Sequence, residues 1–128
     1  MQLETIHHIA LIGHDYQQMY DFYVNKLGFK VISQHERPAK EDTILNVQQG
    51  ALTLEIFIKP AAPARPSLPQ PETQGLRHLA FKVASVTTTL HQFDQLGIPH
   101  ETLRYDDFTH QPMAFFFDPS GQPLEIHE

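Results

Sequence analysis

Two histidines and two glutamates occupy equivalent places in the two halves of this 128-residue chain. His8 begins a His-Ile-Ala triplet, and His78 begins a His-Leu-Ala triplet 70 positions later. Glu55 is the centre of a Leu-Glu-Ile triplet, and Glu125, again 70 positions on, is the centre of another. In each half the glutamate therefore follows the histidine by 47 positions. Imidazole nitrogens and carboxylate oxygens are ligands for divalent metals such as Zn²⁺, Ni²⁺, Mn²⁺ and Fe²⁺, so these four residues are candidate metal ligands.

Side chains alternate between the two faces of a strand, so each of the four candidates is predicted to lie on the face opposite the aliphatic residues of its strand. In a first strand over Ile6 to Ile12, His8 points away from Ile9 and Leu11, while His7 shares their core face. The glutamates likewise oppose the aliphatic residues of their own strands. Any one of these residues alone is better explained as a solvated residue of an exposed sheet. Four in register favour a metal ion, because two carboxylates among apolar residues are costly to bury without a cation between them.

Each half is predicted to contain a strand, a helix and further strands. Asp15 and Ser85 are suitable N-caps, and Gly28 and Gly97 are suitable residues just beyond the helix ends. The predicted strands are Ile6 to Ile12, Phe29 to Ser33, Thr43 to Gln48 and Ala51 to Ile58 in the first half, and Leu76 to Val83, Met113 to Phe117 and Pro123 to His127 in the second. We therefore predict an α+β fold in which two tandem βαβββ modules form a cupped mixed sheet around a metal site.

The length predicts one domain (residues 1–128) made of module one (1–58), a linker (59–74) and module two (75–128). The linker carries five prolines at a spacing close to three residues: Pro60, Pro63, Pro66, Pro69 and Pro71. This spacing favours an extended polyproline II connector between the modules. A docking motif for an aromatic groove is the weaker alternative.

Composition excludes several function classes. The chain has no cysteine, so disulfides, thiolate metal sites and cysteine nucleophiles are absent from it. The net charge of −6, without clustered Lys or Arg, argues against nucleic-acid and anionic-membrane partners. We find no apolar run long enough to cross a bilayer and no signal-peptide pattern, so a cytoplasmic location is expected. Neither a nicotinamide fingerprint nor a phosphate loop occurs.

The motifs together resemble the glyoxalase/bleomycin-resistance/extradiol-dioxygenase (vicinal oxygen chelate) superfamily. The resemblance covers nearly the whole chain and rests on these segments: His8-Ile9-Ala10, Asp21-Phe22-Tyr23 through Leu27-Gly28-Phe29, Arg77-His78-Leu79-Ala80-Phe81, Asp118-Pro119-Ser120-Gly121 and Leu124-Glu125. Within that superfamily the chain is most similar to glyoxalase I-like proteins, which fill all four ligand positions and have a glutamate in the second, as Glu55 does here. The extradiol and fosfomycin-modifying types use only three of the four.

The resemblance implies a divalent-metal-dependent enzyme of the lactoylglutathione lyase type, with Ni²⁺, Zn²⁺ or Mn²⁺ bound by His8, Glu55, His78 and Glu125. Such an enzyme isomerises the hemithioacetal of an α-ketoaldehyde and a thiol. Glu125 is then the better candidate for the catalytic base, with Glu55 as its counterpart. One residue departs from the pattern: the arginine that holds the glutathione carboxylate is replaced by Ile12, and Lys59 is the nearest substitute for its charge.

Two alternatives differ from this hypothesis in class. The first is an Fe²⁺ extradiol-type dioxygenase that uses only His8, His78 and Glu125. The second is a non-enzymatic protein that sequesters a small ligand such as an antibiotic. We expect a small-molecule substrate and a homodimer, because the free face of each sheet must close on another surface. The sequence leaves open the substrate, the thiol, the metal, and whether the site forms within one chain or across a dimer.

Overall fold

The computed structural model describes residues 1–66 and 72–128, so Pro69 and Pro71 of the predicted connector lie outside the described residues. The chain divides into two compact units, Met1–Ala64 and Arg65–Glu128, and each is described here by itself. Each unit contains one four-stranded mixed sheet with the element order βαβββ. The predicted α+β fold with two tandem βαβββ modules is confirmed. No helix in the described ranges has the length and apolar character needed to span a bilayer.

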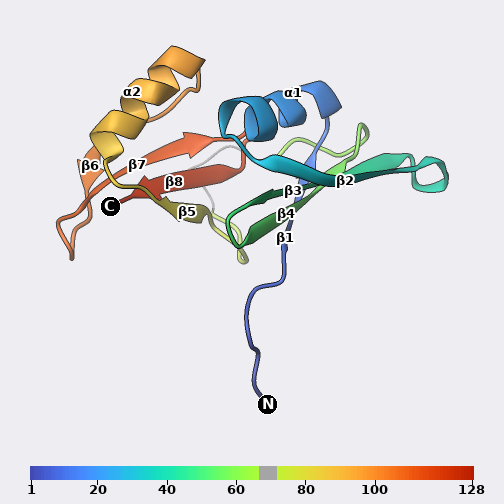
Figure 1. Ribbon diagram of the computed structural model, residues 1–128, viewed down its shortest axis with the longest axis horizontal. Coiled ribbons are helices and arrows are strands. Elements are labelled where there is room, and N and C mark those ends of the chain that lie inside the picture. Colours follow the sequence, from blue (N-terminus) through green and yellow to red (C-terminus); the bar gives the residue numbers. More distant parts are fainter. Residues whose placement is uncertain (67–71) are drawn as a thin grey trace. The chain divides into compact units, whose positions relative to one another are not determined.

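The first unit forms a sheet with the strand order β1-β4-β3-β2 (Figure 1). Strand β1 runs parallel to β4, and the other neighbours are antiparallel. Its elements are β1 (Ile9–Gly13), α1 (Tyr16–Tyr20), a π-helix that continues α1 (Asp21–Lys26), β2 (Lys30–Arg37), a 3-10 turn (Pro38–Lys40), β3 (Asp42–Gln49) and β4 (Leu52–Ile58).

The second unit has the same topology, with the strand order β5-β8-β7-β6 and a parallel β5–β8 pair. Its elements are β5 (Leu79–Lys82), α2 (Val86–Leu96), β6 (Arg104–Tyr105), β7 (Pro112–Phe117) and β8 (Pro123–His127). Strand β6 was not predicted, because two residues are too short to show an alternating pattern. Only its pairing with β7 defines it as a strand.

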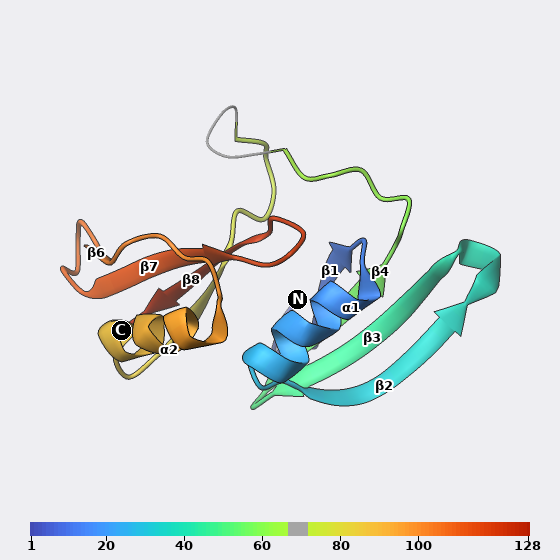
Figure 2. The same ribbon diagram turned by 90° about the horizontal axis from the view of Figure 1, so that it is seen from above.

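In the first unit, α1 and the π-helix cover one face of the sheet (Figure 2). The predicted aliphatic face of β4 is confirmed, since Leu54 and Ile56 are fully buried. The helical segment contributes Met19 and Tyr23, which are also buried. Burial of these apolar side chains is the main stabilising term for the unit.

The second unit is built in the same way, with α2 packed along its sheet (Figure 2). Phe93 of α2 contacts Phe116 of β7, with ring centroids 4.7 Å apart. Leu124 and Ile126, which flank Glu125 in sequence, are buried. The core of each unit therefore lies between its helix and one face of its sheet, as the alternation predicts.

The predicted helix boundaries are confirmed by their hydrogen bonds. The carboxylate of Asp15 accepts a hydrogen bond from the backbone N–H of Gln18 at 2.8 Å. The hydroxyl of Ser85 accepts one from the backbone N–H of Thr88 at 3.2 Å. Gly97 follows α2 with a φ of +64°, a left-handed conformation that glycine adopts without a steric penalty.

The helix of the first unit differs from the prediction in its hydrogen-bond pattern. We expected one regular α-helix up to Leu27, but the last six residues before it form a π-helix. The N–H of Leu27 donates to the carbonyl of Phe22 at 2.9 Å, five residues earlier. Phe22 and Tyr23 are both buried, with their rings edge to face at 5.0 Å. The wider π turn accommodates two adjacent aromatic side chains in the core, a tertiary requirement that helical spacing alone does not reveal.

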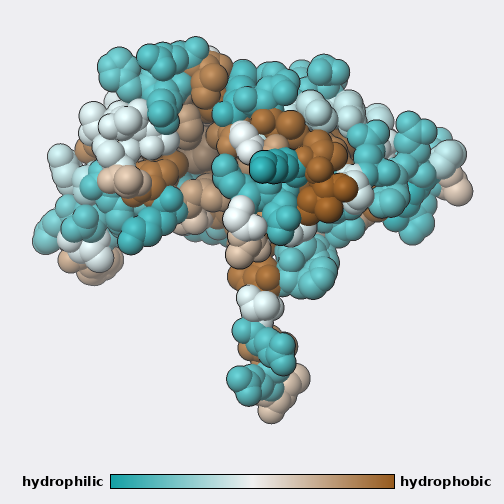
Figure 3. Space-filling model, in the orientation of Figure 1, coloured by the Kyte–Doolittle hydropathy of each residue, from teal (hydrophilic) through white to brown (hydrophobic). Residues whose placement is uncertain are grey.

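The first strand of each unit is shorter than predicted. Strand β1 begins at Ile9 instead of Ile6, and residues 1–8 extend away from the sheet (Figure 1). The space-filling view shows this arm as a mixed polar and apolar chain, with Leu3 and Ile6 exposed (Figure 3). His7, expected on the core face, is therefore exposed, which corrects the prediction. A strand needs a partner beside it, and the β1 ladder begins only where Ile9 meets β4.

Candidate metal centre

The first candidate pair, His8 and Glu55, lies in the first unit. His8 directly precedes β1, and Glu55 is at the centre of β4, where its Cα pairs with that of Ala10. Nε2 of His8 lies 3.2 Å from Oε2 of Glu55. Both side chains remain partly exposed, on the face of the sheet opposite the helix. The other ring nitrogen of His8 contacts Nδ1 of His7 at 2.9 Å.

The second candidate pair, His78 and Glu125, repeats this arrangement in the second unit. His78 directly precedes β5, and Glu125 pairs with Ala80 on the parallel strand β8. Nε2 of His78 lies 3.0 Å from Oε2 of Glu125. The side chain of Glu125 is only 8% exposed. The ring of Phe115 lies edge-on to the imidazole of His78, with centroids 5.2 Å apart.

In both pairs, Nε2 of the histidine faces Oε2 of the glutamate, and the two residues occupy equivalent positions of the βαβββ module. In each, the histidine precedes the first strand and the glutamate lies on the parallel neighbour of that strand. The structure thus brings His8 to Glu55 and His78 to Glu125. Within residues 1–66 and 72–128, no three or more side chains of His, Cys, Asp or Glu form a group that could hold a metal ion. Each unit therefore contributes two candidate ligands.

The separations within the pairs fit two ligands of one metal ion. Ligands about 2.1 Å from a common metal lie about 3.0 Å apart at a right angle and about 3.4 Å apart at a tetrahedral angle. The observed nitrogen–oxygen separations of 3.2 and 3.0 Å fall in this interval. They equally suit a direct hydrogen bond when Nε2 carries the proton. Two imidazoles and two carboxylates also form a donor set suited to Zn²⁺, Ni²⁺, Mn²⁺ or Fe²⁺.

A cluster of charges lies at the end of the same sheet, beyond Ile58, the last residue of β4. Asp42 is completely buried at its side chain and accepts hydrogen bonds from three donors: Nε of Arg37 at 2.7 Å, Nη2 of Arg37 at 2.6 Å and Nζ of Lys59 at 2.6 Å. These contacts, Arg37 first, lower the pKa of Asp42 to about 2. Lys59, expected to supply charge to a thiol, is thus held on Asp42.

Arg37 and Asp42 were missed by the sequence analysis. The guanidinium of Arg37 lies 5.2 Å from the ring centroid of Phe57, two residues beyond Glu55 on β4. Its pKa is raised, chiefly by the hydrogen bonds to Asp42 and to a smaller extent by the charge of Glu55. A signal existed in the sequence, because charges of opposite sign flank the short turn Pro38–Lys40. We had ended the second strand at Ser33, which left that turn unrecognised.

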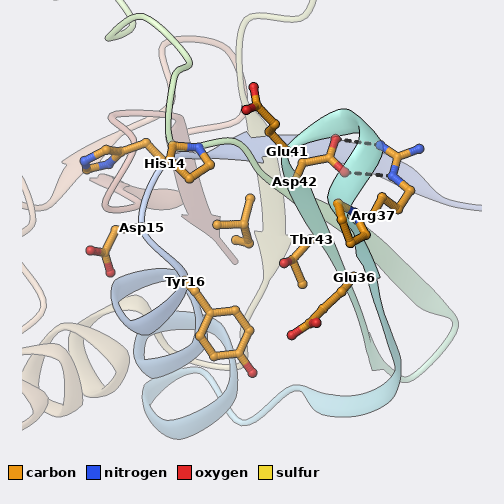
Figure 4. Close-up of a pocket in the computed structure, with 11 residues that line it drawn as sticks. His14, Asp15, Tyr16, Glu36, Arg37, Glu41, Asp42 and Thr43 are labelled. Atoms are coloured by element: carbon orange, nitrogen blue, oxygen red, sulfur yellow. Dashed lines mark hydrogen bonds and ion pairs between the residues drawn. The ribbon is translucent and has the colours of Figure 1, made fainter.

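A solvent-open cavity also lies in the first unit, beside the N-terminus of α1 (Figure 4). Its polar wall includes His14, Asp15, Glu36 and Glu41. The hydroxyl of Tyr16 at its edge donates to Oε1 of Gln34 at 2.7 Å. Burial of Tyr16 raises its pKa, and the neighbouring Tyr20 adds to the effect. None of the four candidate ligands lines this cavity, so it is not the predicted metal centre.

Arg77 and His100 of the second unit also have structural partners. Nε of Arg77 donates to Oε1 of Glu72 at 2.6 Å. His100 lies 2.8 Å from the carbonyl of Glu101 and 3.1 Å from Oδ1 of Asp94. The carbonyl and then the carboxylate raise the pKa of His100. These contacts are local ones that stabilise loops and helix ends.

Comparison with known proteins agrees with the fold. Residues 5–126 match the model of the Glyoxalase/Bleomycin resistance protein/Dioxygenase superfamily. The match spans both units and includes all four candidate ligands. The chain belongs to this superfamily.

Three relatives illustrate the range of similarity. A glyoxalase family protein from Enterococcus faecalis is 49% identical, with 100% of each chain covered and a TM-score of 0.94. The uncharacterised protein YwkD of Bacillus subtilis (strain 168) is 41% identical, over 100% of this chain and 99% of that protein. The trypanothione-dependent glyoxalase I of Leishmania major is 21% identical, over 98% of this chain and 87% of that one, with a TM-score of 0.75. At this identity the last similarity concerns the fold alone.

Proposed function

We propose that this protein is a metal-dependent enzyme of the glyoxalase I type, with one divalent ion bound by His8, Glu55, His78 and Glu125. The observation that carries the proposal is the recurrence of one His–Glu contact, at 3.2 and 3.0 Å, in two equivalent motifs. Members of the superfamily typically bind a divalent metal. Four such ligands match a complete glyoxalase I set, whereas a three-ligand dioxygenase would leave Glu55 without a role.

The proposed reaction is the isomerisation of a hemithioacetal formed by an α-ketoaldehyde and a thiol. A divalent ion bound at the four residues would supply positive charge that polarises two adjacent substrate oxygens. Glu125 would act as the base: its carboxylate would remove the proton from the carbon that bears the sulfur and return it to the neighbouring carbon, while the hydroxyl proton passes to the former carbonyl oxygen. Its low exposure keeps water away from this proton. Glu55 is the equivalent carboxylate of the other motif.

We propose that the thiol part of the substrate is not glutathione, or that the glutathione adduct binds only weakly. A carboxylate that leaves water needs a cation or several hydrogen-bond donors in return. Ile12, at the position of the usual arginine, offers neither and is 55% exposed. The glyoxalase I of Leishmania major, which has the same fold, is trypanothione-dependent, so a thiol other than glutathione is compatible with this fold.

The decisive experiment joins metal analysis and turnover in one preparation. The protein is purified without added metal, its metal content is measured, and methylglyoxal hemithioacetals of several thiols are then supplied. We expect about one divalent ion per four-residue site and isomerisation that Glu125→Gln abolishes. Glu41→Gln, which alters a carboxylate of the cavity wall, is the matched control and should be active.

Two outcomes would overturn the proposal. Protein that contains metal but turns over no hemithioacetal, and instead consumes oxygen with a catechol, would be a dioxygenase. Protein that binds small ligands without converting any of them would be a sequestering protein.

A further inference from the structure

His7 directly contacts one of the four candidate metal ligands. Its Nδ1 lies 2.9 Å from Nδ1 of His8, and the two rings are nearly perpendicular, with an interplanar angle of 82°. Both residues belong to the arm that precedes β1, which begins at Ile9 (Figure 1). His7 is exposed and takes no part in the core of the first unit. Its contact with His8 is therefore not a consequence of core packing.

The two ring nitrogens of His8 face different partners. Nε2 lies 3.2 Å from Oε2 of Glu55, and a carboxylate accepts hydrogen bonds but donates none. In the metal-free protein Nε2 therefore carries the proton of the neutral imidazole, which leaves Nδ1 as an acceptor. Nδ1 of His7 must then donate to it, because a hydrogen bond needs one proton between its two heavy atoms.

Binding of a metal ion at His8 would reverse these roles. A nitrogen that binds a metal carries no proton, so a neutral His8 bound through Nε2 keeps its proton on Nδ1. That N–H needs an acceptor, which in most metal sites is a carboxylate, a carbonyl or a water molecule. Nδ1 of His7 can be this acceptor once the proton of His7 is on its Nε2. An imidazole suits the exchange because either of its nitrogens can donate or accept.

The residue that precedes the second histidine lacks this capacity. Arg77 lies 70 positions after His7, and its Nη1 is 3.4 Å from Nδ1 of His78. A guanidinium donates hydrogen bonds and never accepts them. Arg77 therefore suits the metal-free form of His78, in which Nε2 donates to Oε2 of Glu125 at 3.0 Å. In a metal-bound form, Nδ1 of His78 would carry a proton and Arg77 would have to turn away from it.

We propose that His7 is a positioning residue of the metal centre, which exchanges donor and acceptor roles with His8 when a metal ion binds. The inference rests on the proposed function, since it takes His8 as a ligand through Nε2. It adds a residue outside the set of four ligands. It also distinguishes the two halves of the site, because His8 has a hydrogen-bond partner in both states and His78 has one only in the metal-free state.

The first test measures Zn²⁺ affinity by calorimetry in variants of position 7. His7→Ala should bind roughly tenfold more weakly, the lower end of the usual effect of a residue that supports a metal ligand, because water reaches this exposed position. His7→Asn places an amide oxygen or nitrogen where Nδ1 lies, so it can accept or donate and should keep most of the affinity. His7→Lys offers donors only and should bind no better than His7→Ala.

Position 77 supplies the matched control in the other half of the site. Arg77→Ala removes the equivalent side chain and should not weaken Zn²⁺ binding. Arg77→His should strengthen it, because His78 would gain the reversible partner that His8 has.

Four results would overturn the inference. They are equal affinity of wild type and His7→Ala, affinity of His7→Asn as low as that of His7→Ala, affinity of His7→Lys as high as that of wild type, and a loss in Arg77→Ala as large as that in His7→Ala. The last result would show that both side chains give only general structural support.

NMR of labelled imidazole nitrogens gives a readout that general structural support would not change. The N–H signals, and the coupling between the two Nδ1 atoms across their hydrogen bond, show which ring holds the shared proton. We expect the proton on His7 in the metal-free protein and on His8 in the protein loaded with Zn²⁺. A proton that stays on the same ring in both states would contradict the exchange.

The same measurements separate this inference from the proposed function. If wild type binds Zn²⁺ but neither the affinity nor the shared proton depends on His7, the inference is wrong and the proposed function stands. If wild type binds no divalent metal, the proposed function is wrong and the exchange of roles is overturned with it.

Discussion

Nε2 of His78 lies 3.0 Å from Oε2 of Glu125, a carboxylate that is 8% exposed. A buried carboxylate is stable only with a partner that offsets its lost hydration. In the second unit the imidazole is that partner, and His8 stands in the same relation to Glu55 in the first. The same relationship in two units gives the metal hypothesis its sharpest test.

Replacing His78 by Ala should abolish tight metal binding. Even residues that only support metal ligands typically contribute about 10–100-fold to affinity, so loss of a direct ligand should exceed roughly 100-fold. Calorimetric titration with Zn²⁺ and Ni²⁺ measures the effect. His91→Ala, at an exposed position of α2, is the control and should bind metal normally. Binding that survives both His8→Ala and His78→Ala would show that the site lies elsewhere.

Ile12→Arg should lower the KM for the glutathione hemithioacetal of methylglyoxal, from a raised value in the wild type. Ile12 lies two residues beyond Ala10, which pairs with Glu55, so a guanidinium there would reach the same face. Steady-state kinetics on both proteins provide the comparison. Ile32→Arg places the same charge at another exposed apolar position and should not lower KM. Wild-type turnover as efficient as that of a dedicated glyoxalase I would contradict this account of the thiol pocket.

Asp42 should make the first unit sensitive to acid. Folding lowers its pKa from 3.8 to about 2, so its contribution to stability is complete above about pH 4 and is lost as pH falls towards 2. The free energy of unfolding, measured in urea at a series of pH values, should fall more steeply in this window for wild type than for Asp42→Asn. Identical slopes would show that Arg37 and Lys59 do not stabilise the ionised form.

Gly13→Ala should destabilise the first unit by about 1–3 kcal/mol, the usual cost of overpacking a core. An added Cβ would lie 2.5 Å from Cγ and 2.7 Å from Sδ of Met19, whose side chain is buried. Urea denaturation measures the loss. Adding Met19→Ala should cost less in this background than in wild type, because the two side chains would no longer collide. Strict additivity of the two changes would refute the close contact.

We expect the protein to form a homodimer. Each unit has one sheet face covered by its helix and one without a helix, and residues 1–8 carry exposed Leu3 and Ile6. Apolar surface of this kind is commonly covered by association. Light scattering should report a mass about twice the 14.7 kDa of one chain. A mass near that of a single chain would indicate a monomer.

The sequence alone determined the repeat, the fold class and the faces of the main strands. An offset of 70 between matching motifs reveals two modules without any coordinates. Alternation separates Leu54 and Ile56 from Glu55, because neighbouring side chains of a strand point to opposite faces. The helix ends could also be predicted from sequence, because Ser85 and Gly97 act through local hydrogen bonds and local backbone conformation. These features depend on contacts between residues close in sequence, or on the period of the pattern.

The tertiary structure decided what depends on distant partners. Strand β1 begins at Ile9 because that is where β4 lies beside it, and the π-helix follows from packing Phe22 and Tyr23 together in the core. Arg37 of β2 meets Lys59, which directly follows β4, only because both reach the buried carboxylate of Asp42 on β3. No periodicity within a single segment encodes such a meeting. It arises when strands far apart in sequence pair in one register, because the register fixes which side chains lie side by side on a face of the sheet.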